Sequence, residues 1–523
     1  MRDLNELPGS AFQVKKKIRR NLEARKRKVL ARLEAALDRP TDAQDLGPVM
    51  SARRIQYELA TKTQAIAHGG VGAVHMLARK LGLPQRIDAD LQLLKQHRPY
   101  HESDHVLNIA YNPLCGGRVL DDIELRRNDE GFLNALGAEA IPDPTTAGDF
   151  CRRFDNHAIE RLMDIINAVR VDVWKQQRPE FMQETARIDA DGTIVPTSGE
   201  CKEGMALSYK GEWGFHPLVV SLANTGEPLF IENRSGNRGS AEGAAARFDQ
   251  AAALCRGAGF KDILFRGDTD FSQTQHLDRW DADGIRFVFG YDARKNMVNE
   301  AERICDDDYE QLCRRAAGAF SAQTRAKQPR VKEAVVVANG YRNVKLRSED
   351  VADFDYRPIA CEKTYRVVVV RKNLTVERGE VALFDDVRYF FYVTNDHQMP
   401  DEQVVREANE RCNQENLIAQ LKNGAHALHA PLNEFNANWA YMVISSLAWS
   451  LKAWFALTLP VCDRWREKHE NERADVLRME FRSFCNAFVH VPAQILTTGG
   501  QLVYRLLSWN RWQATLFRLL DAV

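Results

Sequence analysis

The sequence contains no Cys-x-x-Cys pair and no excess of charge of either sign. Its ten cysteines are scattered, which is typical of reduced thiols and excludes a dense disulfide framework. Basic and acidic residues are equal in number, 72 of each. This balance neither indicates nor excludes a nucleic-acid partner, because such binding depends on local patches. Residues 1–6 are charged and lack an apolar stretch, so we expect no signal peptide.

Only one stretch is apolar and long enough to suggest a membrane helix. Residues 438–459 carry few charges, but Lys452 interrupts them and Pro460 follows them. Because a lysine in the middle of a spanning segment is costly, we expect a buried core helix instead.

Three histidines also recur at regular spacing without predicting a metal site. His97, His101 and His105 stand four residues apart, as zinc ligands on one helix would. However, Pro99 interrupts any helix there and no cysteine joins them. We therefore expect no zinc site at these residues.

The densest cluster of basic residues lies near the N-terminus. Between residues 15 and 32 there are ten Lys or Arg residues and a single acid, Glu23. A helix of this composition would be positive on most faces, which favours salt-dependent contacts with DNA phosphates. The alternative is a solvated helix or a basic arm that binds no DNA. The candidate DNA-binding residues are Lys15, Lys16, Lys17, Arg19, Arg20, Arg25, Lys26, Arg27 and Lys28, and Arg32 completes the cluster.

The length of 523 residues exceeds one hydrophobic core and predicts about two to four domains. The pattern of apolar residues changes along the chain. We expect a helical region, the first part of an α/β core, a β-rich insertion with a charged helical start (296–315), the second part of the core and a helical tail. Their ranges are 1–180, 185–291, 292–385, 386–460 and 461–523.

The core region reads as strand, strand, strand, helix, strand, helix and strand. A turn at 224–227 joins the second and third strands into a hairpin. Three antiparallel strands that lead into parallel crossovers predict a mixed α/β sheet. The expected strands are 186–191, 217–223, 228–232, 263–268 and 285–290, with helices at 241–257 and 272–282.

Two of these strands end in acids. Asp191 closes the first strand and Asp268 closes the fourth. We expect these strands to be neighbours, so the two carboxylates would lie close together. Crowded carboxylates repel one another, and a bound divalent cation is one way to keep them ionised. Hard cations such as Mg²⁺ prefer these oxygen ligands, and two ions can stabilise both oxygens of a phosphoryl transfer.

A third acid is expected on a helix at 402–423. At about 100° per residue, Glu415 lies about 40° and Lys422 about 20° from Arg411 around an unbroken helix. An acid flanked by two cations suits metal binding beside a phosphate, which Arg411 can bind bidentately and Lys422 as a point charge. The alternative is a surface helix with ordinary charge spacing.

Three motifs occur in order on the predicted strand, strand and helix. Asp191-Gly192-Thr193 is similar to "Asp-Gly-Thr", and Asp268-Thr269-Asp270-Phe271 is similar to "Asp-x-Gly-Phe". Arg411, Glu415 and Lys422 match "Tyr-x2-Arg-x3-Glu-x6-Lys". Over about residues 140–460 the chain therefore resembles the Asp-Asp-Glu transposases of bacterial insertion sequences. The long interval before Glu415 matches the branch with a β-rich insertion.

The chain departs from this pattern at two positions, and each assignment has a competitor. The signature tyrosine is replaced by Ala408, and Asp270 stands where the second motif has glycine. Asp189 shares a strand face with Asp191, which we favour because Gly-Thr follows it. Asp270 competes with Asp268 and is expected to cap the next helix instead. Glu410 also follows an arginine by four residues, but no lysine stands seven residues beyond it.

The resemblance implies an α/β fold with a ribonuclease-H-like core, a β-rich insertion and helical ends. It implies a DNA transposase in which Asp191, Asp268 and Glu415 bind two Mg²⁺ ions, for which Mn²⁺ can substitute. Arg411 and Lys422 would contact DNA phosphate. The expected partners are terminal inverted repeats and target DNA, bound by a homodimer in a bacterial cytoplasm, with no membrane. The alternatives are a metal-dependent nuclease and a catalytically silent, transposase-derived DNA-binding protein.

Overall fold

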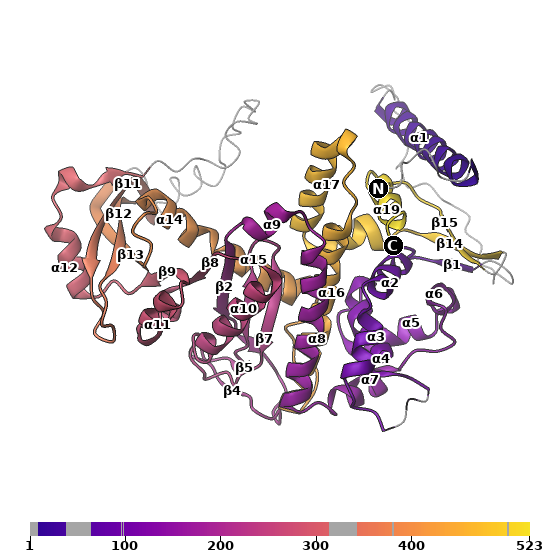
Figure 1. Ribbon diagram of the computed structural model, residues 1–523, viewed down its shortest axis with the longest axis horizontal. Coiled ribbons are helices and arrows are strands. Elements are labelled where there is room, and N and C mark those ends of the chain that lie inside the picture. Colours follow the sequence, from indigo (N-terminus) through magenta and orange to yellow (C-terminus); the bar gives the residue numbers. More distant parts are fainter. Residues whose placement is uncertain are drawn as a thin grey trace. The chain divides into compact units, whose positions relative to one another are not determined.

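The computed structural model describes residues 9–37, 64–95, 97, 99–312, 342–378, 381–498 and 501–523. The chain forms two compact units (Figure 1). We call Trp174–Ala419 the sheet unit, and Met1–Val173 together with Gln420–Val523 the helical unit. Each is described by itself below.

The sheet unit is built around one mixed sheet in the order β10-β11-β12-β13-β9-β8-β2-β6-β7. β2 pairs antiparallel with β6, β6 pairs antiparallel with β7, and β2-β8-β9 are parallel. All five predicted core strands are present, and their pairing confirms the mixed ribonuclease-H-like sheet. Their bounds are β2 Ala186–Gly192, β6 Leu218–Leu222, β7 Glu227–Glu232, β8 Ile263–Gly267 and β9 Arg286–Tyr291.

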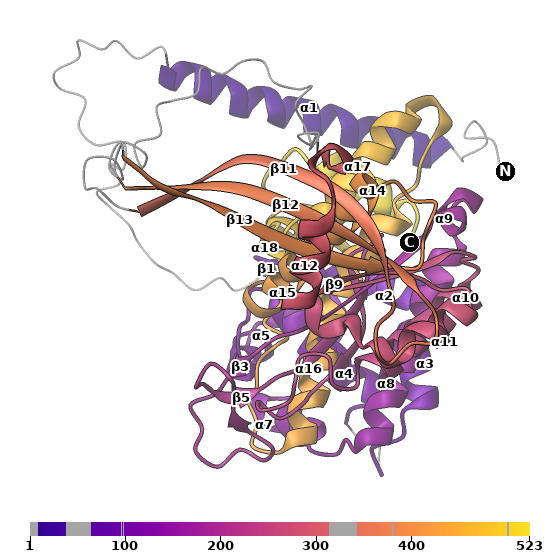
Figure 2. The ribbon, with the colours of Figure 1, turned by 90° about the vertical axis from the view of Figure 1, so that its left-hand side faces the viewer.

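The β-rich insertion extends this same sheet. β13 pairs antiparallel with β9, and the long strands β11, β12 and β13 run side by side as a meander (Figure 2). The helix expected over 296–315 is shorter, because α12 ends at Arg303 and a strand follows. By sequence we also expect a basic loop at 324–332 and a β-rich run at 334–338, and both lie outside the described residues. The bounds are α12 Lys295–Arg303, β10 Glu310–Gln311, β11 Arg342–Tyr356, β12 Tyr365–Arg378 and β13 Val381–Thr394.

Helices pack on opposite faces of the core sheet because side chains alternate along each strand. Phe265 of β8 contacts Phe248 of α10, with ring centroids 4.6 Å apart. The next residue, Arg266, points the other way and bonds to Glu407 of α14. α14 therefore covers the face opposite α10. These helices are α10 Ala244–Ala258, α11 Leu277–Ala282, α14 Asp401–Glu410 and α15 Asn413–Asn423, with α9 Pro179–Gln183 before β2.

A second, small sheet follows β2. Its order is β3-β5-β4, and both pairings are antiparallel. These short strands were not predicted from the sequence. They are β3 Val195–Pro196, β4 Ala206–Leu207 and β5 Trp213–Phe215.

The helical unit has α16, Phe435–Thr458, at its centre. This helix is long and apolar enough to cross a membrane by length and composition, but its apolar window is fully buried within the unit. Lys452 is buried too, and its Nζ donates to the Leu477 carbonyl at 2.7 Å while lying 3.9 Å from the Trp449 ring. The burial matches the predicted core helix.

The remaining helices of this unit come from both ends of the chain. They are α1 Gly9–Leu37, α2 Val71–Lys80, α3 Leu83–Asp90, α4 Glu102–Leu114, α5 Ile123–Arg127, α6 Glu130–Leu136, α7 Pro144–Cys151, α8 Asn156–Lys175, α17 Arg466–Arg478, α18 Phe481–Phe484 and α19 Gln513–Leu520. Thr146 is a possible cap of α7 by sequence, but the N-cap is Asp143, which accepts from the Thr146 amide at 2.8 Å.

The prediction of an entirely helical tail was wrong. β14, Ala493–Thr498, and β15, Gln501–Leu506, pair antiparallel, and β1, Gln64–Ile66, joins the edge of β14. The sequence carries a hairpin signal here, since two glycines separate runs that contain β-branched and aromatic residues. The three strands tie the first and last parts of the helical unit together.

Candidate active site

The register of β2 and β8 brings Asp191 and Asp268 to one edge of the sheet. The strands are parallel, and Asp189 pairs with Arg266. Asp191 and Asp268 each follow that pair by two residues. Side chains two residues apart on a strand point to the same face of the sheet. Both acids therefore lie on one face, near the carboxyl ends of neighbouring strands.

The backbone just after β8 fixes Asp268. Its Oδ1 accepts a hydrogen bond from the Asp270 amide at 3.0 Å, so Asp268 is the N-cap of the 3-10 turn at Thr269–Ser272. Asp270 is exposed in the first turn. The predicted capping role therefore belongs to Asp268, because it is the residue with extended backbone immediately before the turn.

The unbroken helix expected at 402–423 is interrupted at Arg411. α14 ends at Glu410, and the Gln414 and Glu415 amides donate to carbonyls three residues earlier, those of Arg411 and Cys412. These shorter bonds tighten the chain and break the continuous helical ladder. The predicted unbroken helix was therefore wrong, since Arg411 belongs to neither helix, but Arg411 still contacts Glu415 four residues beyond it.

The break places the Arg411 guanidinium between two acids. Its Nη1 lies 3.4 Å from Asp191 Oδ2, and its Nη2 lies 3.3 Å from Glu415 Oε1. Only 13% of the Arg411 side chain is exposed, against 62% of the Glu415 side chain. We call Asp191, Asp268, Glu415 and Arg411 the acidic cluster. Lys422 lies in the last turn of α15, and its carbonyl is 3.0 Å from His429 Nε2.

The acidic cluster holds more negative charge than its arginine compensates. The pKa of Asp191 is raised to about 6, mainly by burial, with the charges of Asp268 and Glu415 adding to the shift and Arg411 opposing it. Burial also raises the pKa of Asp268, with Asp270 adding to the shift and Arg411 opposing it. The pKa of both aspartates stays raised although Arg411 is near, so the cluster has too little positive charge for its acids.

The donor set of the acidic cluster fits a hard divalent cation. It offers three carboxylates, the ligands that Mg²⁺ and Mn²⁺ prefer, at an edge where added positive charge would be favourable. Among the described residues, no three His, Cys, Asp or Glu side chains lie close enough to hold one ion as they stand. Glu415 contacts Arg411, and its exposed side chain has room to turn toward the aspartates. A cation would therefore exchange the Arg411 contact for carboxylate ligation.

A buried ion network lies directly behind the acidic cluster. Arg266 donates to both oxygens of Asp189 at 2.7 and 2.9 Å and to Glu407 at 2.9 Å. Glu407 also accepts two 2.8 Å bonds from Arg187. We call Asp189, Arg266, Glu407 and Arg187 the ion network. Burial acts to raise the pKa of Glu407, but the bonds and charges of the two arginines outweigh it and hold that pKa below its usual value.

The ion network indicates which of the two aspartates of β2 is the candidate metal ligand. Asp189 is 1% exposed and fully engaged by Arg266, so it joins α14 to the sheet. The ion pair of Asp191 within the described part of the chain is the longer one with Arg411, at 3.4 Å. The sequence could not separate them, because both occupy the same strand face.

Gln414 positions the start of α15, and the sequence did not predict its role. Its buried amide donates to the Val219 carbonyl at 2.9 Å and accepts from the Ser221 hydroxyl, both on β6. The residue after it is Glu415. In the sequence, the only indication of this role was that Gln414 is a polar residue next to the predicted acid Glu415. Ala408, at the place of the signature tyrosine, packs instead against the apolar cluster that includes Leu264 and Val404.

The basic cluster lies on α1, as predicted for a helix. Arg25 is not available for DNA, because its Nη1 donates to the carbonyls of Leu506 and Ser508 at 2.8 and 3.1 Å. The side chain of Lys15 lies outside the described residues. The other members are exposed, namely Lys16, Lys17, Arg19, Arg20, Lys26, Arg27, Lys28 and Arg32.

The sheet, its acids and its insertion fit one protein family. The profile described as "Transposase DDE domain group 1" matches residues 48–499, which is more than half of the chain. The chain belongs to this family. The transposase therefore acts on DNA and catalyses strand cleavage and strand transfer. Members of the family generally use divalent metal ions, in agreement with the donor set of the acidic cluster.

Among solved structures, the transposase is similar to the piggyBac transposase in a synaptic complex with hairpin DNA. The two sequences are 10% identical, and the TM-score is 0.33. The match covers 80% of this chain and 88% of the other. No curated protein matches the chain. The fold assignment therefore rests on the strand order and on the family match.

Proposed function

We propose that Asp191, Asp268 and Glu415 are the catalytic acids of this transposase and that together they hold two Mg²⁺ ions, for which Mn²⁺ can substitute. The observation that carries this proposal is the uncompensated charge of the acidic cluster, where Arg411 contacts two acids and the pKa of Asp191 is raised to about 6. Ions bound there would stabilise the charge that develops on the attacking and leaving oxygens of phosphoryl transfer.

The protein's own groups orient DNA at this edge. When Glu415 turns to a metal ligand position, Arg411 is released to bind a phosphate bidentately, and Lys422 supplies a second cation. In cleavage, water forms a new P–O bond at the element end, and the bond to the 3′ oxygen breaks. In strand transfer, the freed 3′-hydroxyl forms a P–O bond with target DNA and expels the target's own 3′ oxygen.

The DNA partners we propose are the terminal inverted repeats of an insertion sequence and a target duplex. The exposed lysines and arginines of α1 would hold the repeats by phosphate contacts, without Arg25. Two ends must be held together for transposition, so we propose a homodimer on DNA, acting in the cytoplasm of a bacterium.

A cleavage and strand-transfer assay tests this function with DNA that carries the element's own terminal repeats, with and without Mg²⁺. Wild type should cut and join only with the metal, and Asp268→Ala should do neither. Asp270→Ala is the matched control, because it removes an exposed acid two residues away and should leave both products. Hydrolysed ends without joined products would indicate a nuclease. Tight binding without either product would indicate a silent DNA-binding protein.

A further inference from the structure

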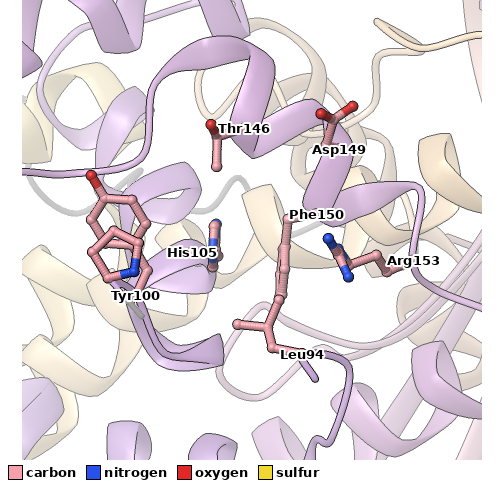
Figure 3. A pocket seen from close by; sticks show the side chains of 8 residues that line it. Leu94, Tyr100, His105, Thr146, Asp149, Phe150 and Arg153 are labelled. Carbon is pink, nitrogen blue, oxygen red and sulfur yellow. The ribbon is translucent and has the colours of Figure 1, made fainter. Parts of the chain in front are cut away.

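The helical unit contains a pocket that the proposed function does not use. Its cavity measures about 210 Å³. One water needs about 10–15 Å³ on such a measure, whereas pockets for drug-sized ligands begin at about 300 Å³. The cavity therefore has the size of one small ring system with a substituent. Its walls include Leu94, Tyr100, His105, Thr146, Phe150 and Arg153 (Figure 3).

One wall of this pocket is aromatic and carries an unsatisfied polar atom. The His105 ring stacks on Phe150, with centroids 4.4 Å apart and planes 7° apart, and it meets the Tyr100 ring edge-on at 5.6 Å. His105 is 4% exposed, and its Nδ1 has no hydrogen-bond partner among the residues that the structure describes. A buried nitrogen without a partner is costly, so a ligand that bonds to it would remove that cost.

The histidine is neutral at physiological pH. Burial lowers the pKa of His105 to about 4, with Asp104 and Glu102 opposing and Arg153 adding to the shift. A neutral imidazole has one N–H donor and one bare nitrogen acceptor. It therefore suits the edge of a neutral heterocycle.

The pocket also carries a cation whose neighbour provides a comparison. Asp149 also lines the pocket, and its carboxylate is paired with Arg152 at 2.7 Å. Arg152 is paired with Glu434 as well, at 3.1 Å. Arg153 lines the pocket with its guanidinium turned toward the Phe150 ring, and it forms no ion pair within the described part of the chain (Figure 3). An exposed, uncompensated guanidinium beside an aromatic wall attracts an anionic group, and phosphate is its best geometric match.

We infer that this pocket binds one unstacked nucleotide, with the base against the aromatic wall and His105 and the phosphate at Arg153. The ring size of the cavity, the neutral hydrogen-bonding atom and the cation are the three features that such a ligand requires. The nucleotide can come from a distorted DNA strand or from free mononucleotide. A nucleotide that comes from DNA rests on the proposed function, whereas the nucleotide site itself does not.

Fluorescence of 2-aminopurine tests this site in the full-length protein without added metal, so the result does not depend on catalysis. One probe is a short duplex with a single bulged 2-aminopurine, and the other is the free 2-aminopurine deoxynucleoside monophosphate. Wild type should change the fluorescence of the bulged base on binding. Arg153→Gln and His105→Phe should each raise the protein concentration needed for half-saturation about tenfold or more. A loss of this size is typical of one stacked base or one charge-assisted hydrogen bond.

Arg161→Gln is the control, since it removes the same charge from an exposed arginine that does not line the pocket and is paired with Asp90. Its half-saturation should stay within about twofold of wild type. His105→Phe should not lower the thermal unfolding midpoint, because it keeps the ring stack and removes the unpaired nitrogen. Equal losses for Arg161→Gln and Arg153→Gln would overturn the site, as would unchanged fluorescence of both probes in wild type. If Arg153→Gln converted a dimer to a monomer and left probe binding unchanged, the pocket would bind a second copy of the chain instead of a nucleotide. Equal binding of both probes would keep the nucleotide site and make free nucleotide its source. The Mg²⁺ cleavage assay on wild type separately reports whether the proposed function holds.

Discussion

The acidic cluster and the ion network occupy the same face of the same two strands, yet their charges are handled in opposite ways. In the ion network two carboxylates meet two guanidiniums at 2.7–2.9 Å, and Asp189 and Arg266 are almost completely buried. In the acidic cluster one arginine serves three carboxylates and contacts two of them, Asp191 and Glu415, at 3.3–3.4 Å. A shift of two residues along each strand thus separates a fixed structural element from a site that needs a cation.

The largest expected effect comes from removing one acid of the cluster. Glu415→Gln should lower metal-dependent DNA cleavage by about 10⁴-fold, because a neutral amide is a poor ligand for a hard cation. Rates of end cleavage under single-turnover conditions measure this loss. Glu410→Gln is the control, since Glu410 also follows an arginine by four residues and is paired with it at 3.2 Å. An equal loss in both variants would show that the cluster has no special role.

Breaking the ion network should cost stability. Arg266→Met leaves Asp189 and Glu407 with less positive charge in a buried site, and we expect it to reduce the free energy of unfolding by about 3–5 kcal/mol. Urea denaturation measures the difference. Glu410→Gln again serves as a control, because its 3.9 Å contact with Arg266 is half-exposed and should contribute less than about 1 kcal/mol. A loss below about 1 kcal/mol for Arg266→Met would contradict the structural role of the network.

Neutralising Asp191 should instead stabilise the metal-free protein. The folded-state pKa of Asp191 is raised from 3.8 to about 6. Protonation therefore supports folding fully below the unfolded pKa, and this support is lost as pH rises through about 6. The stability advantage of Asp191→Asn over wild type in chelator should grow between pH 4 and pH 7.5 to roughly 2–3 kcal/mol. Urea titrations across that range measure it, and an advantage that does not change with pH would contradict the charge imbalance.

Loosening the support of Glu415 should have the smallest effect. Gln414→Ala removes the bonds to β6 and should slow cleavage about 10–100-fold, as expected for groups that orient metal ligands. DNA affinity should change little. Asn416→Ala, an exposed change on the other side of Glu415, should cleave at the wild-type rate. If both variants cleaved equally fast, the position of α15 would not depend on Gln414.

The core strands and the acids at their ends could be predicted because their signals are local. Short apolar runs ending in aspartate, separated by turns and helices, define β2, β6, β7, β8 and β9. The C-terminal hairpin of β14 and β15 had a comparable Gly-Gly signal, but the surrounding Trp, Leu and Arg residues favoured helix. Local composition therefore predicted the core better than the tail.

The distinction between paired and unpaired acids could not be read from the sequence. Asp189 is paired with Arg266 of β8, whereas Asp191 contacts Arg411 in the break after α14, and both partners lie far along the chain. The break at Arg411 depends on bonds to residues three rather than four positions earlier, and the spacing of Arg411, Glu415 and Lys422 suits either geometry. Gln414 acts through β6, which no spacing rule connects to it.

The most direct test compares Asp191→Asn with Asp189→Asn in Mg²⁺-dependent cleavage of terminal-repeat DNA, with the folded fraction of each measured by urea denaturation. We expect no product from Asp191→Asn although it folds, and product from Asp189→Asn in proportion to its folded fraction. Cleavage by Asp191→Asn, together with its loss in well-folded Asp189→Asn, would contradict the assignment of Asp191 and make Asp189 the catalytic acid.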